Sequence, residues 1–226
     1  MNNKLIGYNE FFLNLTNLYE KKSLPNKILL SGKKGIGKSL LAEHLINFIY
    51  SMDENYKYDL KNLEMNIDKK SNILFQKNSH PNIFKIFKNY DKKNIEISQI
   101  REMIKFQNKS SFNDKIRTIL IDDVEYLNLN STNALLKCIE EPAKNLLFML
   151  INNSEKKIPD TLKSRCIEFK LSLNLNDIKT IINNYYNENI YDEIPNDFIT
   201  FYNSPSIIIS LINFMKENEI DYKKSD

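Results

Sequence analysis

Residues 32–39 carry the clearest chemical signal in this chain, because they match the phosphate-loop pattern G-x-x-x-x-G-K-[ST]. In such a loop, glycines let backbone N–H groups turn toward phosphate oxygens, the lysine reaches the β/γ oxygens, and the hydroxyl binds Mg²⁺. The eight residues are Gly32, Lys33, Lys34, Gly35, Ile36, Gly37, Lys38 and Ser39. We therefore predict a nucleotide site in which Lys38 contacts phosphate and Ser39 binds magnesium.

Polar residues that end two later apolar runs form a second candidate group. Asp122 stands where it can hold the Mg²⁺ that Ser39 also binds, and Asp123 follows it. Asp123 occupies the place of a general base for water, but its side chain is one methylene shorter than that of glutamate. Asn152 is placed to sense the γ-phosphate. Asp122 and Asn152 also fit a simpler interpretation, in which Asp122 only ends a strand or caps a helix and Asn152 only ends a strand.

Arginine is scarce, with three residues against 29 lysines, which indicates positions where lysine does not suffice. Arg165 lies in the triplet Ser164-Arg165-Cys166, just before a short apolar segment. A planar guanidinium there can stabilise charge that develops on a transferring phosphoryl group. An exposed arginine after a helix is also commonly just a solubilising residue, so this interpretation stays open.

Strands and helices alternate along the first three quarters of the chain. Apolar runs predict strands at Lys27–Leu30, Arg117–Ile121 and Leu146–Ile151. Alternation predicts a short strand at Ile83–Phe87, and a last strand is expected at Ile167–Phe169. Helical spacing predicts helices at Lys38–Tyr50, from a Ser98 N-cap onward, and at Ser131–Glu140 before Pro142. This alternation predicts an α/β fold with a parallel sheet covered by helices, whose ligands bind beyond the carboxyl ends of the strands.

The end of the chain has a different character. Three helices without strands are predicted, at Leu175–Tyr186, Asp197–Phe201 and Ser206–Met215. We therefore expect a nucleotide-binding domain over residues 1–170 and a small helical domain over 171–226. The polar connection from Ser51 to about Ser79 shows only weak helical signs, at Leu60, Leu63 and Met65.

Composition excludes several classes of protein. The formal net charge is only +3 over 226 residues, although residues 85–117 hold nine basic residues against four acidic ones. That segment fits either a solvated surface or a patch for a polyanion. Two cysteines without a further ligand at metal-like spacing indicate reduced thiols. The polar start and the short apolar runs predict a cytoplasmic protein with no membrane span.

Four segments together resemble the AAA+ clamp-loader subunits of bacterial DNA polymerase III. The most specific is the helix that ends in Glu-Glu-Pro, and the triplet around Arg165 follows it at the distance typical of the family. The segments are residues 32–39, Ile119–Asp123, Asn133–Pro142 and Ser164–Cys166.

The resemblance covers roughly residues 4–215 and implies an AAA+ module with a helical lid, working in a five-subunit ring that places the sliding clamp on primed DNA. It implies ATP or ADP with Mg²⁺, bound by the phosphate loop and by Asp122 as the Walker B carboxylate. It also implies that Asn152 is the first sensor and that Arg165 is an arginine finger acting on the neighbouring subunit. Residues Leu5, Ile6 and Gly7 would lie along the adenine pocket.

Departures from the family pattern favour the delta-prime branch over the gamma/tau motor. The motor carries Asp-Glu where this chain has Asp122-Asp123, and a lid arginine where this chain has Ser206. Both differences predict nucleotide binding with weak hydrolysis, and partners among the gamma/tau and delta subunits. A gamma/tau-like motor that hydrolyses ATP itself stays the alternative. Zinc is not implied, because residues 51–79 contain no cysteine, and the family's collar domain is expected to be absent from this sequence.

Overall fold

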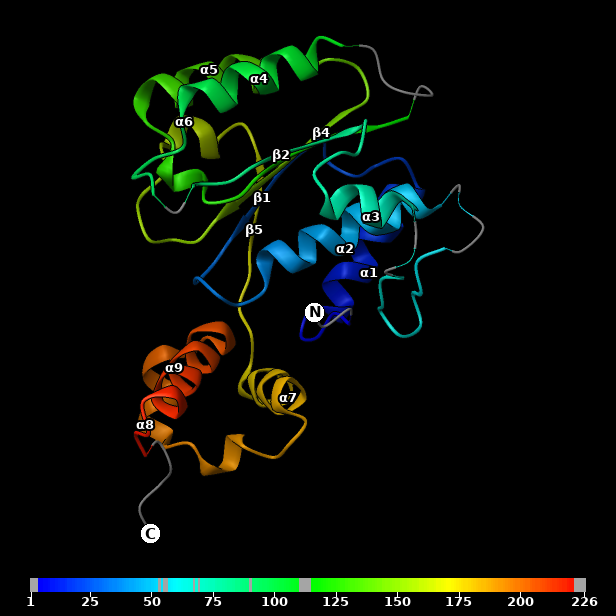
Figure 1. Ribbon diagram of the computed structural model, residues 1–226. Coiled ribbons are helices and arrows are strands. Elements are labelled where there is room, and N and C mark those ends of the chain that lie inside the picture. The colour runs from blue at the N-terminus through cyan, green and yellow to red at the C-terminus, as the bar shows by residue number, and fades with distance from the viewer. Residues whose placement is uncertain are drawn as a thin grey trace.

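A five-stranded, entirely parallel sheet forms the centre of the molecule in this computed structural model (Figure 1). The structure describes residues 4–52, 54, 57–66, 68, 70–89, 91–109 and 115–221. The strands are β1 (Lys27–Ser31), β2 (Ile83–Ile86), β3 (Arg117–Ile121), β4 (Leu146–Asn152) and β5 (Ile167–Lys170). Their order across the sheet is β2-β3-β4-β1-β5, and all five strands were predicted from the sequence.

Both faces of the three central strands, β3, β4 and β1, are buried, which explains their apolar runs, whereas the edge strands β2 and β5 are partly exposed and carry charged residues. Ile28 and Leu30 of β1 face one hydrophobic core, and Leu29 between them faces the other. Strand β4 repeats this pattern over seven buried residues. The predicted α/β fold with a covered parallel sheet is therefore confirmed.

Helices from the first part of the chain cover one face, and those that follow β2 cover the other (Figure 1). The first set is α1 (Asn9–Glu20), α2 (Lys38–Ser51) and α3 (Lys70–Gln76). The second set is α4 (Ile97–Gln107), α5 (Leu129–Glu140) and α6 (Asp160–Lys163), with a 3₁₀ turn η2 at Val124–Tyr126. The chain thus changes faces after β2, so the connections that leave the neighbouring strands β1 and β4 lie on opposite faces of the sheet. This pair of strands is the switch point, which is where parallel sheets bind ligands.

The remaining helices follow β5 as a separate cluster at one end of the molecule (Figure 1). They are α7 (Leu175–Tyr186), α8 (Asn196–Tyr202) and α9 (Pro205–Glu217), with a 3₁₀ turn η3 at Tyr191–Glu193. Asn174 caps α7 by accepting a hydrogen bond from the Asp177 N–H at 2.8 Å. Pro205 opens α9, where its missing N–H costs nothing. The three predicted C-terminal helices are thus present, each slightly longer than or equal to its prediction.

Several local expectations were wrong or incomplete. Leu60, Leu63 and Met65 lie in turns and beside an isolated bridge between Asp59 and Glu64, whereas the helix of this segment begins only at Lys70. Helices α1 and α6 were not predicted. Helix α4 begins at Ile97 rather than after a Ser98 cap, because a capping box between Glu96 and Gln99 fixes its start.

Arg117 lies inside the fold, although it belongs to the basic segment 85–117. Its side chain is 5% exposed, and its Nη1 donates to the carbonyls of Phe106, Gln107 and Lys109 at the end of α4. A planar, always charged donor can satisfy several helix-end carbonyls at once. Lys85 is also half-buried, against the ring of Phe75. Arg117 and Lys85 therefore do not form a freely solvated basic surface, while positions 90 and 110–114 lie outside the described residues.

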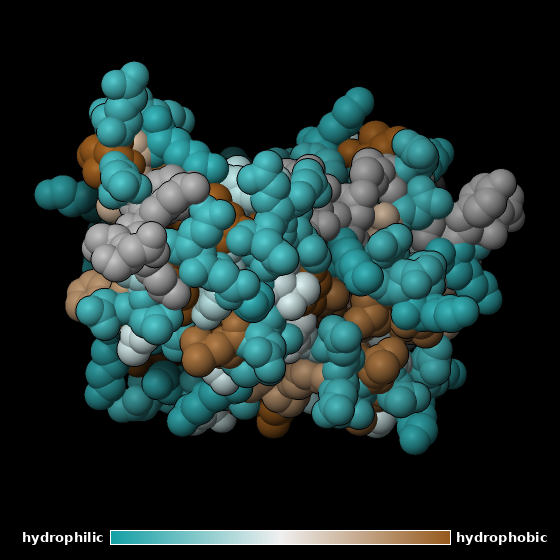
Figure 2. Space-filling model, turned by 90° about the horizontal axis from the view of Figure 1, so that it is seen from below, coloured by the Kyte–Doolittle hydropathy of each residue, from teal (hydrophilic) through white to brown (hydrophobic). Residues whose placement is uncertain are grey.

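The face seen from the C-terminal helices is mostly hydrophilic, with separate hydrophobic patches (Figure 2). On α7–α9 the large hydrophobic side chains with more than half of their surface exposed are Leu175, Tyr185, Phe201 and Phe214. Scattered apolar residues of this kind are normal on a protein surface. Among the described residues, no helix combines the length and apolar character that crossing a bilayer would require.

The burial of His44 predicts that the folded state loses stability in acid. This α2 side chain is fully buried, its Nδ1 lies 2.5 Å from the Tyr58 hydroxyl, and burial lowers its pKa to about 4. The neutral ring is favoured in the folded state, so stability is complete above the unfolded pKa of 6.5 and is lost as pH falls toward 4. Urea unfolding should show that His44→Leu loses about 2 kcal/mol less between pH 7 and pH 5 than the wild type.

His80, whose pKa burial also lowers to about 4, is present in both proteins and serves as the internal reference. An equal loss of unfolding free energy in the two proteins would contradict the assignment to His44.

Candidate functional site

The phosphate loop joins β1 to α2, and two of its glycines adopt a left-handed backbone. Gly35 has φ +78° and Gly37 has φ +90°, conformations that side chains rarely allow. Gly37 is also the N-cap of α2, so the positive end of a 14-residue helix faces the loop. This is the arrangement that helix N-termini use to bind phosphate.

Lys38, the first residue of α2, is 2% exposed and points into the loop. Its Nζ donates to the carbonyl oxygens of Gly32 at 3.0 Å and Lys33 at 2.6 Å. Burial lowers the pKa of Lys38 to about 8, against the opposing effect of nearby carboxylates, of which Asp122 is the largest contributor. The loop therefore holds a desolvated cation, which an anion would stabilise.

Ser39 and Asp122 meet as predicted from the sequence. The Ser39 hydroxyl donates to Oδ2 of Asp122 at 2.5 Å, although the two residues lie 83 positions apart. Burial raises the pKa of Asp122, and the hydrogen bond from Ser39 opposes that rise. A hydroxyl and a carboxylate oxygen directed at one point form the kind of donor set that Mg²⁺ accepts. These residues fit the magnesium role expected for them.

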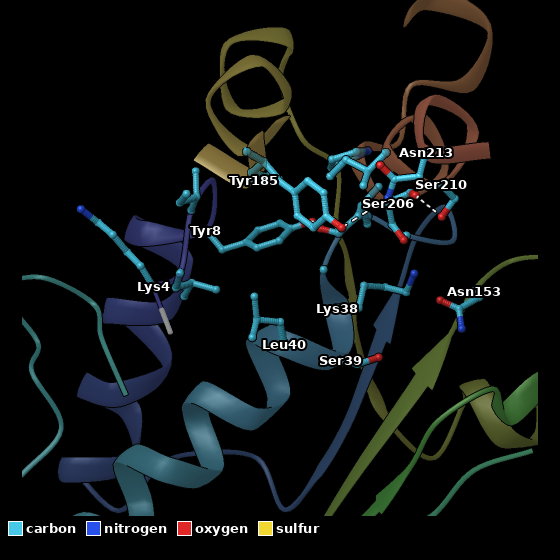
Figure 3. A pocket seen from close by; sticks show the side chains of 18 residues that line it. Lys4, Tyr8, Lys38, Ser39, Leu40, Asn153, Tyr185, Ser206, Ser210 and Asn213 are labelled. Atoms are coloured by element: carbon cyan, nitrogen blue, oxygen red, sulfur yellow. Dashed lines mark hydrogen bonds between the residues drawn. The ribbon is translucent and has the colours of Figure 1, made fainter. Parts of the chain in front are cut away.

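The two asparagines at the end of β4 differ in their surroundings. Asn152 is 5% exposed, and its Oδ1 accepts from the Ser154 N–H at 3.0 Å. Asn153 lines the cavity beside the loop (Figure 3). Its Nδ2 donates to Oδ1 of Asp123 at 2.8 Å. The sensing role of Asn152 stays a prediction. Asn153 is a second candidate that sequence reasoning missed, because two adjacent asparagines at a strand end cannot be ranked without the backbone.

Asp123 belongs to an acidic cluster with Glu125 and Glu155, whose carboxylate oxygens lie within 4.8 Å of one another. Lys34 of the phosphate loop partly compensates this charge, with its Nζ 3.1 Å from Oε1 of Glu155. The hydrogen bond to Glu155 raises the pKa of Lys34, whereas burial raises the pKa of Glu125. The cluster thus links the loop to the segments that follow β3 and β4.

A cavity of about 440 Å³ opens beside the loop, between the N-terminal segment and the C-terminal helices (Figure 3). This volume is in the range of small-molecule sites. Leu5 and Ile6 line it as expected, but Gly7 does not: it packs against Leu173 and Asp177 with φ +86°. The other lining residues are Lys4, Tyr8, Gly35, Ile36, Gly37, Lys38, Ser39, Leu40, Asn153, Ile181, Tyr185, Pro205, Ser206, Ile209, Ser210 and Asn213.

The C-terminal helices contact the loop directly. The buried Ser204 hydroxyl donates to the Lys34 carbonyl at 2.7 Å, and the Ser206 N–H donates to the Gly35 carbonyl at 3.2 Å. A Cβ added to Gly35 would lie 2.5 Å from the Ser204 oxygen. The start of α9 therefore rests on the loop backbone, which only the tertiary structure could reveal.

Arg165 lies outside this site. It is not among the cavity residues, and its side chain, 35% exposed, pairs with Glu140 at the end of α5. Its Nη1 also donates to the Thr161 carbonyl at 2.8 Å. The structure therefore brings the loop, Ser39 and Asp122 together, and it places Arg165 outside this group.

Comparisons with known proteins agree with this architecture. The family described as "DNA polymerase III, delta subunit" matches residues 7–174. The delta-prime subunit of DNA polymerase III from Buchnera aphidicola subsp. Schizaphis graminum is 31% identical over 212 residues, covering 92% of this chain and 60% of the relative. A putative replication factor C small subunit of Acanthamoeba polyphaga mimivirus is 33% identical over 168 residues, or 73% of this chain and 45% of that relative.

Among solved structures, the gamma subunit-related protein of Thermotoga maritima has a TM-score of 0.56 at 16% identity, covering 88% of this chain and 57% of that one. This likeness shows a shared fold. The chain spans less than two thirds of the length of each of these three proteins. By its family match, this chain belongs to the DNA polymerase III delta subunit family, and within it resembles the delta-prime subunit.

Proposed function

We propose that this chain binds ATP or ADP at the phosphate loop and serves as a delta-prime-like subunit of a clamp loader in DNA replication. The observation that carries the nucleotide site is the convergence of buried Lys38 with the Ser39–Asp122 pair beside a cavity of nucleoside size. Lys38 and the loop N–H groups hold the phosphates, and Ser39 and Asp122 hold Mg²⁺, which supplies charge neutralisation when bound. The base lies against Leu5 and Ile6.

Two features support the proposal that this chain binds nucleotide but hydrolyses ATP slowly. Oδ1 of Asp123 accepts a hydrogen bond from Asn153, so one oxygen of the short candidate base is already engaged. Ser206 takes the place of the second-sensor arginine, and no arginine lines the cavity among the described residues. The chain then acts mainly as a stator, with residues 1–170 as the nucleotide-binding domain and 171–226 as the lid.

The proposed role of Arg165 is that of an arginine finger, which acts on the nucleotide bound by a neighbouring subunit. Its position outside the cavity supports a role in trans, because it contacts no residue of its own phosphate loop in the described part of the chain. The partners proposed are gamma/tau and delta subunits, and through them the sliding clamp and primed DNA. The names of the relatives support that setting.

A gamma/tau-like motor is the second candidate, because the Lys38, Ser39 and Asp122 arrangement is complete enough to support hydrolysis. Steady-state ATPase assays of the isolated chain separate the two. We expect turnover well below about 1 per second, and no further loss in Asp123→Ala. A faster turnover that Asp123→Ala abolishes would establish the motor and refute the stator.

The depressed pKa of Lys38 predicts pH-dependent nucleotide binding. Phosphate favours the protonated, charged form of the Lys38 amine. In the free protein this amine loses its proton above about pH 8, so the affinity for nucleotide should fall as pH rises. Calorimetry with MgATP should give binding about tenfold weaker at pH 9 than at pH 7.

The Lys38→Ala variant should bind weakly at both pH values and lose this dependence. Equal wild-type affinities at pH 7 and pH 9 would rule out Lys38 as the titrating phosphate ligand.

Arg165→Ala should lower hydrolysis at the adjacent site of a reconstituted loader by on the order of 100-fold or more, since a finger guanidinium stabilises the transition state. The isolated variant should keep its own ATP affinity, because Arg165 does not line its own cavity. Arg101→Ala, which removes an exposed arginine of α4, is the matched control. Loss of the chain's own ATP affinity would show that Arg165 acts in cis.

A further inference from the structure

The guanidinium of Arg165 is held by two neighbouring elements. Its Nε donates to Oε1 of Glu140 at 2.7 Å, and its Nη2 lies 2.5 Å from the same oxygen. Its Nη1 donates to the carbonyl of Thr161, within α6, at 2.8 Å. Helices α5 and α6 pack against each other here, close to the segment that leads into β5 (Figure 1). The side chain is therefore fixed although it is 35% exposed.

The pattern of these bonds leaves part of the guanidinium available. Arginine carries five N–H donors, and the contacts with Glu140 and Thr161 use three of them. One N–H on each terminal nitrogen remains unused. Two such donors can still engage phosphate oxygens while the inner edge of the group stays anchored.

Helix stability does not explain a carboxylate at position 140. Glu140 is the last residue of α5, where the helix dipole and the unpaired carbonyls disfavour negative charge. Glu141 follows it, and its side chain has no hydrogen bond or ion pair in the part of the chain that the structure describes. Of the two acidic residues that end α5, only Glu140 contacts Arg165.

We propose that Glu140 is a positioning residue for Arg165, which holds the guanidinium extended so that its two unused donors meet phosphate in the adjoining subunit. This inference rests on the proposed finger role of Arg165. A flexible arginine would have to be ordered in each catalytic cycle, whereas an anchored one is oriented in advance. Glu140 itself touches no nucleotide in this scheme.

The contact between Glu140 and Arg165 allows the effect of anchoring the guanidinium to be tested apart from the effect of the negative charge of Glu140. Nε donates a hydrogen bond to Oε1 and Nη2 lies 2.5 Å from the same oxygen, so a glutamine carbonyl in the same place can keep the hydrogen bond and stay in contact with Nη2. Glutamine removes the negative charge but keeps the anchor, while alanine removes both. Glu140→Gln should therefore resemble the wild type, and Glu140→Ala should not.

The test measures ATP hydrolysis, as kcat and KM, by loaders reconstituted from the full chain with its gamma/tau and delta partners, the clamp and primed DNA. We expect Glu140→Ala to lower kcat about tenfold with KM within about twofold, and Glu140→Gln to stay within about twofold of the wild type. Glu141→Ala should have no effect. In an Arg165→Ala background, Glu140→Ala should cause no further loss, because its effect passes through Arg165.

Contrary outcomes are distinguishable. If Arg165→Ala leaves hydrolysis unchanged, the finger fails and the positioning role falls with it. If Arg165→Ala lowers kcat while Glu140→Ala does not, only the positioning role is overturned. If Glu140→Ala and Glu140→Gln both raise kcat, the carboxylate shields the guanidinium, which contradicts positioning. Nucleotide affinity and thermal unfolding of each isolated variant identify any loss that comes from misfolding.

Discussion

The Ser39–Asp122 contact depends on one constraint, the order of the parallel strands. Ser39 follows β1 and Asp122 follows β3, and β4 lies between those two strands in the sheet. Because all the strands are parallel, their carboxyl ends share one edge, so residues 83 positions apart meet without any local sequence signal. The same edge places Asn153 beside Asp123. The site therefore follows from strand order, and the buried apolar strands are what make it rigid.

The phosphate loop is also held from outside the sheet. Ser204 and Ser206, at the start of α9, bond to the carbonyls of Lys34 and Gly35. Gly35 then serves two purposes, since its φ of +78° suits the turn and its missing Cβ leaves room for Ser204. Any movement of the loop on binding phosphate has to be accommodated by these contacts. The C-terminal helices are thus mechanically connected to the phosphate loop.

Sequence reasoning predicted what short-range physics determines. The sequence patterns identified all five strands, and the glycine pattern identified the loop with Lys38 and Ser39. Asp122 was expected beside Ser39 because it ends a buried strand. It failed where tertiary contacts decide, as with α1 and α6, whose patterns are short or lack caps. It also could not rank Asn152 against Asn153. Nothing in the sequence indicated that Arg117, within the basic segment 85–117, is buried, because its partners are backbone carbonyls of Phe106 and Gln107.

The pKa values of Lys34 and Lys38, two lysines of the phosphate loop, are shifted in opposite directions. Lys34 already pairs with Glu155, which raises its pKa, whereas Lys38 is buried against backbone carbonyls and its pKa falls to about 8. An incoming phosphate recovers more electrostatic free energy from a desolvated amine than from one that a carboxylate compensates. In the proposed function, Lys38 is therefore the main contact for phosphate. Lys34 keeps the loop attached to the acidic cluster at the ends of β3 and β4, where Asp123 lies.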